Sequence, residues 1–172
     1  MLLCCCCVAL IAGIKFSGVD VTQSLSSLTG PSPTPTVNKN APVPLKTKAT
    51  ADNGLELTVT EVERPLQVQG SIKIPPDQQL ILVSIRVRNT KKTGAAIKVT
   101  AADFKVKGDG GLTYTPNPAN VTIPDLLSQV DLAAGASKDS ELIFQIASND
   151  TGLQMSWKAG TATRIFSLEN KP

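Results

Sequence analysis

The stretch QLILVSIRVRNT, residues 79–90, decides the fold class of this chain. Its β-branched apolar residues recur at every second position, as Ile81, Val83, Ile85 and Val87, and Ser84, Arg86 and Arg88 fall between them. Successive side chains of an extended strand point to opposite faces of a sheet, so this alternation predicts a strand buried on one face. Valine and isoleucine also fit such a pleated, half-buried surface well.

The same alternation recurs along the chain. It is found at residues 55–59, 97–99, 104–106, 142–146, 153–157 and 166–168, and segments rich in Gly, Pro, Asn and Asp separate these runs. Short strands at a spacing of roughly ten residues predict an all-β, immunoglobulin-like antiparallel β-sandwich of about seven to nine strands. A single turn of helix is expected at Pro124–Gln129, with proline at its first position and Asp125 in its first turn.

The N-terminal part of the chain predicts targeting to a membrane. Residues 2–14 are apolar apart from the glycine at 13, and Lys15 ends the run. This apolar helix is shorter than the ~20 residues that span a bilayer, so residues 1–16 are interpreted as a membrane anchor or signal segment. Three alternatives remain: an uncleaved anchor whose start is truncated, a degenerate signal peptide, and palmitoylation of the run Cys4–Cys7.

Residues 17–43 predict a linker. They are rich in Ser, Thr, Pro and Asn, and residues 31–36 read PSPTPT. Such a segment favours extended polyproline II geometry and has too few apolar side chains to fold, so a disordered, semi-stiff stalk is expected. The remaining residues, 44–172, are of a size that suits one domain with one hydrophobic core, the β-sandwich.

Two absences exclude large classes of chemistry. The chain contains no histidine, and its four cysteines all lie at positions 4–7. Zinc and copper sites built from His and Cys, Ser-His-Asp and Cys-His catalytic systems and disulfides within the domain are therefore excluded for residues 8–172. The acidic residues form no calcium-binding loop pattern. We therefore predict no catalytic residue, cofactor or metal, and no enzyme activity; a carboxylate pair of the glycosidase type is the remote alternative.

The net charge of +3 is small, but the cations are unevenly distributed. One stretch holds seven of them against Asp103 alone: Arg86, Arg88, Lys91, Lys92, Lys98, Lys105 and Lys107. If their strands adjoin in one sheet, they form a basic face for an anionic partner. The alternative is a solvated outer face whose lysines guard sheet edges against aggregation. No aromatic residues interleave with these cations, so a nucleic-acid partner is not expected.

Residues 55–168 carry an ordered set of short motifs. These are the long strand ending in Asn89, Asp103-Phe104, a Gly108-Asp-Gly110 turn leading to Tyr114, and a small-residue turn at 132–137 before a further strand. In order and spacing they resemble the telokin-like, immunoglobulin-like domains of unknown function found in bacterial lipoproteins and membrane-anchored surface proteins. The resemblance implies an immunoglobulin-like sandwich and a cell-envelope location, and it implies no catalytic residues.

Together these patterns predict a non-catalytic interaction module that is held outside the cytoplasm at the cell membrane or is secreted. Its expected partner is an envelope protein or an anionic polymer, and residues 1–16 provide the membrane contact. The first alternative is a structural spacer or accessory domain of an envelope complex, without a ligand of its own. An envelope hydrolase is a remote alternative.

Overall fold

The computed structural model describes residues 41–68, 72–117 and 121–169, all within one compact unit, Asn38–Pro172. These residues form ten strands and one 3-10 turn, without an α-helix, so the predicted all-β class is confirmed. The strands are β1 (Lys48–Thr50), β2 (Leu55–Glu63), β3 (Gln78–Asn89), β4 (Ile97–Thr100), β5 (Phe104–Lys107), β6 (Thr113–Tyr114), β7 (Gln129–Leu132), β8 (Ser137–Ala147), β9 (Gln154–Ala159) and β10 (Ala162–Ser167), and the turn η2 is Ala101–Asp103.

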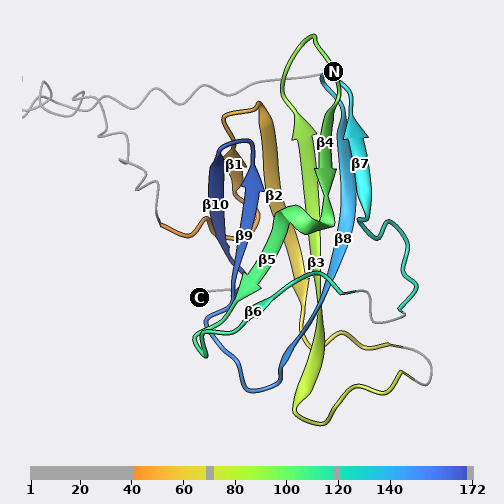
Figure 1. Cartoon of the computed structure of the whole chain (residues 1–172), viewed down its shortest axis with the longest axis vertical. Coiled ribbons are helices and arrows are strands. Elements are labelled where there is room, and N and C mark those ends of the chain that lie inside the picture. The colour runs from red at the N-terminus through yellow and green to blue at the C-terminus, as the bar shows by residue number, and fades with distance from the viewer. Residues whose placement is uncertain (1–40, 69–71, 118–120, 170–172) are drawn as a thin grey trace, which may run out of the picture. The chain divides into compact units, whose positions relative to one another are not determined.

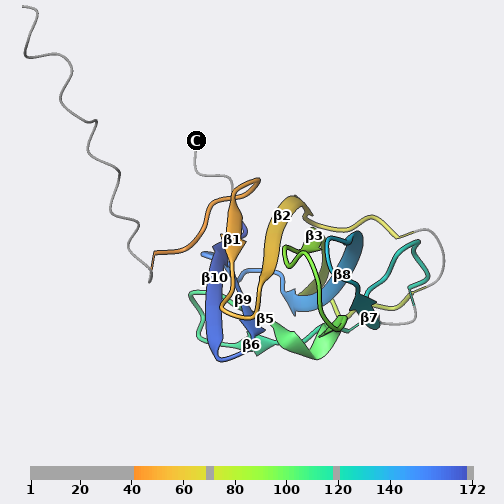
Figure 2. The same ribbon diagram turned by 90° about the horizontal axis from the view of Figure 1, so that it is seen from above.

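The ten strands form three antiparallel sheets (Figure 1). Two have four strands each, in the orders β1-β2-β3-β8 and β10-β9-β5-β6, and the third pairs β4 with β7. The two larger sheets form separate layers when the chain is seen from above (Figure 2). There are more strands than the expected seven to nine, because short strands such as β1 and β6 have too few residues to show an alternating pattern.

One hydrophobic core joins the two larger sheets. It contains Val83 and Ile85 of β3 together with Phe104 of β5 and Trp157 of β9, all at most 1% exposed. The rings of Phe104 and Trp157 are stacked, with centroids 6.4 Å apart and planes inclined by 13°. Full burial of a valine or isoleucine side chain stabilises a fold by roughly 1.5–3 kcal/mol. The inner face of β3, with Val83 and Ile85, is therefore a principal source of stability.

A β-bulge changes the phase of β2. The pairing of β2 with β3 shifts between Val59 and Glu61, and the Oγ1 hydroxyl of Thr60 donates a hydrogen bond of 3.1 Å to the Ser84 carbonyl. Before the bulge the even-numbered residues of β2 face outward, and after it the odd-numbered ones do. Val62 is therefore packed against the core, and Glu61 is exposed.

Strands β1 and β10 lie side by side in both views (Figures 1 and 2). The Arg164 guanidinium donates hydrogen bonds of 3.0 and 2.9 Å to the Thr50 carbonyl, which ties the two sheets together at this edge. Val43 also belongs to the fold, because its amide bonds the Ile165 carbonyl at 2.7 Å and its carbonyl accepts from the Ser167 amide at 2.9 Å. The sequence placed Val43 at the end of the linker, whereas these two bonds join its backbone to β10.

The predicted anchor, and the predicted linker up to residue 40, lie outside the described residues. Among the residues that the structure does describe, no helix is long and apolar enough to cross a membrane.

The helix expected at Pro124–Gln129 is wrong. Asp125 has a φ of 55°, in the left-handed region, and Leu126 forms a bridge with Glu141 at the edge of β8. There the Leu127 amide bonds the Glu141 carbonyl at 2.8 Å, and the Glu141 amide bonds the Asp125 carbonyl at 2.9 Å. An edge strand presents unpaired backbone groups, and pairing with this edge replaces the helical hydrogen bonds.

The Gly108-Asp-Gly110 turn is built around a buried carboxylate from the distant residue Asp150. The Asp150 carboxylate accepts hydrogen bonds from the Gly110 amide at 2.9 Å and from the Tyr114 hydroxyl at 2.8 Å. A Cβ atom at Gly108 would lie 2.2 Å from an oxygen of this carboxylate, so only glycine fits there. The Gly110 amide first, and then the Tyr114 hydroxyl, lower the pKa of Asp150.

A carboxylate with a lowered pKa stabilises the fold above its ordinary pKa, and this contribution is lost as the pH falls through the lowered value. We predict that Asp150→Asn is less stable than the wild type at pH 7 and loses less stability between about pH 5 and pH 2. Urea unfolding followed by Trp157 fluorescence measures both effects. The exposed Asp77→Asn is the matched control, and equal pH slopes for wild type and Asp150→Asn would contradict the account.

Candidate functional site

A polar groove of about 440 Å³ crosses the outer face of the β1-β2-β3-β8 sheet. We call it the outer groove, and it is lined by Lys46, Lys48, Glu56, Thr58, Thr60, Arg86, Arg88, Gly135, Ser137 and Asp139. The alternation of β3 places its arginines here, because the residues between them point into the core. The groove therefore follows directly from the burial of the inner face of the sheet.

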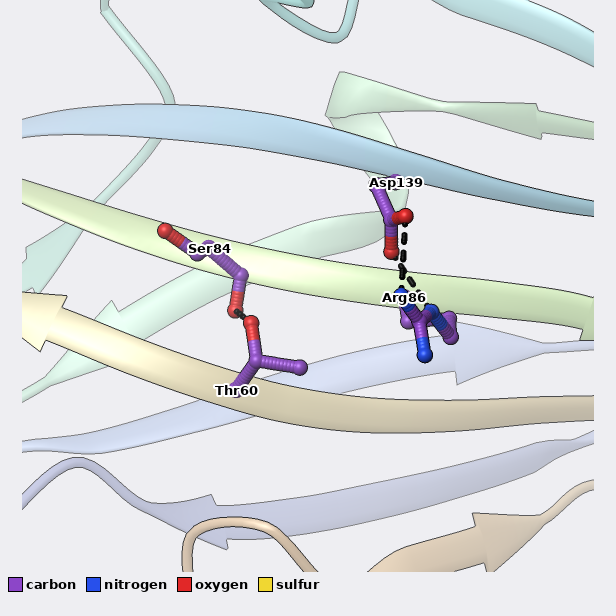
Figure 3. Close-up of polar contacts among 4 residues, drawn as sticks. All are labelled: Thr60, Ser84, Arg86 and Asp139. Atoms are coloured by element: carbon purple, nitrogen blue, oxygen red, sulfur yellow. Dashed lines mark hydrogen bonds and ion pairs between the residues drawn. The ribbon is translucent and has the colours of Figure 1, made fainter.

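The best-defined contact in the outer groove joins Arg86 and Asp139, which are in register on β3 and β8. Figure 3 shows the guanidinium facing the carboxylate, with Nε–Oδ1 and Nη2–Oδ2 distances of 2.7 and 3.0 Å. Hydrogen bonding to Asp139 raises the pKa of Arg86, and the guanidinium lowers the pKa of Asp139. The pair fixes the direction of the guanidinium and leaves its other N–H donors for a ligand.

A second set of polar contacts lies one row further along the sheet (Figure 3). Thr60 donates to the Ser84 carbonyl, and the Ser84 hydroxyl donates a 2.8 Å hydrogen bond to Glu141. The pKa of Glu141 is raised, mainly by burial. The hydrogen bond from the Ser84 hydroxyl lowers this pKa, and nearby carboxylates, including Glu61 and Asp125, raise it further. Glu141 is thus a carboxylate held among other carboxylates.

The outer groove has an excess of positive charge. Its four cations, Lys46, Lys48, Arg86 and Arg88, face two carboxylates, Glu56 and Asp139, which gives 4 − 2 = +2. Lys48 pairs with Glu56 at 3.3 Å and Arg86 pairs with Asp139, whereas Lys46 and Arg88 form no ion pair among the described residues. Two cations of the outer groove thus have no carboxylate within ion-pair distance, and its hydroxyl groups come from Thr58, Thr60 and Ser137.

The predicted basic face does not form as one surface. Arg86 and Arg88 lie on β3, Lys98 on β4, and Lys105 and Lys107 on β5, and these three consecutive strands belong to three different sheets. The five residues are exposed, as the alternation predicted.

The two remaining predicted cations, Lys91 and Lys92, lie in the loop after β3. Only Arg86 and Arg88 of the predicted set reach the outer groove. Lys46 and Lys48 were missed, because β1 has three residues and its pairing with β2 leaves no pattern in the sequence.

Asn89 holds one wall of the outer groove in place. It is fully buried at the end of β3, and its Nδ2 donates to the Leu132 carbonyl at 3.0 Å. Its backbone amide bonds the Ala136 carbonyl at 2.9 Å, and its carbonyl accepts from the Gly135 amide at 3.1 Å. These contacts explain the motif in which a long strand ends in asparagine and a small-residue turn follows.

Two other hollows offer fewer charged or polar groups that could bind a ligand. One hollow, of about 650 Å³, lies beside Pro42 and Glu169, but the Glu169 carboxylate already accepts the Gly152 and Leu153 amides at 2.6 and 3.3 Å. An apolar hollow of about 210 Å³ beside Leu126 and Ile143 has no charged lining residue. In the described part of the chain, no group of His, Cys, Asp and Glu residues could hold a metal ion.

Comparison with known proteins identifies the family. A family model described as "Domain of unknown function (DUF4352)" matches residues 46–164, well over half of the chain. The chain belongs to the DUF4352 family. No curated protein matches the chain in sequence. Residues of the outer groove, from Lys46 to Asp139, all lie within the part that matches the DUF4352 model.

Solved structures share the fold of this DUF4352 domain. The yjhA protein of Bacillus subtilis matches with a TM-score of 0.55 and 12% identity over 74% of this chain and 99% of that one. The secreted protein MPT63 of Mycobacterium tuberculosis matches with a TM-score of 0.53 and 14% identity, over 74% and 98%.

A candidate lipoprotein of B. subtilis (ycdA) matches with a TM-score of 0.55 and 16% identity, over 73% of this chain and 39% of that one. The DUF4352 chain thus spans well under half the length of this relative. At these low sequence identities, the three structural similarities show only that the fold, a β-sandwich, is shared.

We predict that Asn89→Ala lowers the free energy of unfolding by about 1–3 kcal/mol, because the Leu132 carbonyl and the Lys91 amide lose buried partners. Equilibrium urea unfolding measures the change. Asn149→Ala, at an exposed turn, is the control and should change the free energy by less than about 0.5 kcal/mol. Similar losses in the two variants would show that Asn89 does not hold the wall of the outer groove.

Proposed function

We propose that this DUF4352 chain is a non-catalytic interaction domain that works outside the cytoplasm. Residues 1–16 attach it to the cell envelope or direct its export, and the outer groove binds a partner that carries several anionic groups. The observation that supports this function is the excess of two cations in a groove lined by hydroxyl groups. Two proteins of similar fold, a candidate lipoprotein and a secreted protein, support the location.

We also propose that the β-sandwich is of the immunoglobulin-like, telokin-like type. Two antiparallel four-stranded sheets around one core support this assignment. The motifs behind the resemblance have structural roles: Asn89 fastens the small-residue turn, and the Gly108-Asp-Gly110 turn encloses Asp150. These roles are structural rather than catalytic, which agrees with a binding domain.

The spacing of the cations favours a partner with repeated charges. Neighbouring strands lie about 4.8 Å apart, so Lys48 on β1 and Arg86 on β3 are roughly 10 Å apart across the sheet. Along β3, Arg86 and Arg88 are about 7 Å apart. One small anion cannot reach all of these positions, whereas a linear polymer or another protein surface can. Asp139 holds Arg86 in position, which lowers the entropy cost of binding.

The chemistry of the outer groove also supports a non-catalytic role. Its hydroxyl groups on Thr58, Thr60 and Ser137 have no histidine as a base, since the chain has none. The carboxylate of Asp139 is bound to Arg86, and its lowered pKa makes it a poor proton acceptor near neutral pH.

Binding of inorganic polyphosphate to the immobilised full chain tests this function. We expect salt-sensitive binding that weakens on the order of tenfold or more in Lys46→Glu/Arg88→Glu, because the charge complementarity is reversed. Lys105→Glu/Lys107→Glu makes the same change in net charge on the opposite sheet and should bind nearly as well as the wild type.

Equal losses in both double variants would overturn the assignment to the outer groove. No binding by the wild type even at low salt would favour the alternative, a structural spacer without a ligand of its own.

A further inference from the structure

Charge on the outer face of the β1-β2-β3-β8 sheet is sorted by strand. The outward-facing charged residues are Lys46 and Lys48 on and just before β1, Glu56, Glu61 and Glu63 on β2, Arg86 and Arg88 on β3, and Asp139 and Glu141 on β8. The signs across the sheet are therefore positive, negative, positive, negative. Lys138 of β8 alternates with Asp139 and so does not belong to this set of outward-facing residues. It forms an ion pair with Asp125, in the segment that runs beside the free edge of β8.

The strand register arranges these residues in rows across the sheet. The rows are Glu56, Arg88 and Ser137; then Lys48, Thr58, Arg86 and Asp139; then Glu61, Ser84 and Glu141. Lys46 belongs beside the third row, because its amide bonds the Val59 carbonyl at 2.7 Å, next to the bulge. Lys46 and Glu141 thus stand at opposite edges of the same row.

This pattern is complementary to itself under one symmetry operation. Consider two copies face to face about a two-fold axis that runs along the strands, midway between β2 and β3. Each β1 then faces the other copy's β8, and each β2 faces the other copy's β3, so every strand meets one of opposite sign. An axis across the strands would instead place each strand over its own counterpart, with like charges opposed.

We propose that the partner of the outer groove is a second copy of this chain, docked through this face about the axis along the strands; the inference rests on the proposed function. Rows are preserved by the axis, so Lys46 of each copy faces Glu141 of the other, and Lys48 faces Asp139. In the first row Arg88 faces Glu56. Each of these contacts forms twice because the interface is symmetric.

Three charges that lack an ion-pair partner in the single chain gain one in the pair. Lys46, Arg88 and Glu141 form no ion pair among the described residues. Burial and the neighbouring carboxylates Glu61 and Asp125 raise the pKa of Glu141 in the single chain, and a cation facing it would offset the repulsion from those carboxylates. At one end of this face, Leu66, Leu82 and Ile123 pack against the small apolar cluster of Leu80, Val121 and Ile143. Because the contacts are polar and exposed, the pair is weak and sensitive to salt.

Sedimentation equilibrium of the full chain in a neutral, density-matched detergent tests the proposal. We expect reversible dimers at about 50 mM salt that dissociate at about 500 mM salt.

Lys46→Glu and Glu141→Lys should each dimerise at least about tenfold more weakly, because each places like charges opposite one another. An equimolar mixture of these two variants should associate again, since the carboxylate introduced into one chain then faces the ammonium group introduced into the other. Lys105→Glu on the other sheet is the control and should dimerise like the wild type.

A second pair of variants, Arg88→Glu and Glu56→Lys, repeats this test in the first row. A wild type that stays monomeric at low salt, or mixtures that fail to associate in both rows, would overturn the proposal. Polyphosphate binding separates this failure from failure of the proposed function. A monomeric wild type that still binds polyphosphate, with unchanged binding in Glu141→Lys, would overturn the dimer and keep the outer groove as a site for another anionic partner.

Discussion

The burial of the inner face of β3 against the opposite sheet is the interaction on which the rest of the structure depends. β3 pairs with β2 on one side and with β8 on the other along most of its length. Its inward residues share one core with the stacked rings of Phe104 and Trp157. The domain has no disulfide to support it, so this apolar contact carries much of the stability.

The outer face of the sheet is a consequence of that burial. Once Val83 and Ile85 point inward, Ser84 and Arg86 must point outward, and the register with β2 and β8 decides which charges they meet. The bulge at Thr60 turns Glu61 outward as well. The alternation of sign from strand to strand is therefore built by the same pairings that hold the core together.

The long strands could be predicted from the sequence, because their side chains alternate between core and solvent. The outward direction of Arg86 and Arg88 was predictable for the same reason. Sheet membership was not, because β3, β4 and β5 follow one another in the chain but enter three different sheets. Lys46 and Lys48 reach the outer groove through β1, which is too short to show a pattern. The role of Gly108 could not be read either, since it depends on Asp150, a residue far along the chain.

The most direct test of this account compares two adjacent residues of β3, one on each face. Ile85→Ala should lower the free energy of unfolding by about 2–5 kcal/mol, because it opens a cavity in the core. Arg86→Ala should change it far less, because its side chain lies in solvent and pairs only with the exposed Asp139. Equilibrium urea unfolding of both variants measures the difference, and equal losses would contradict the assignment of the two faces.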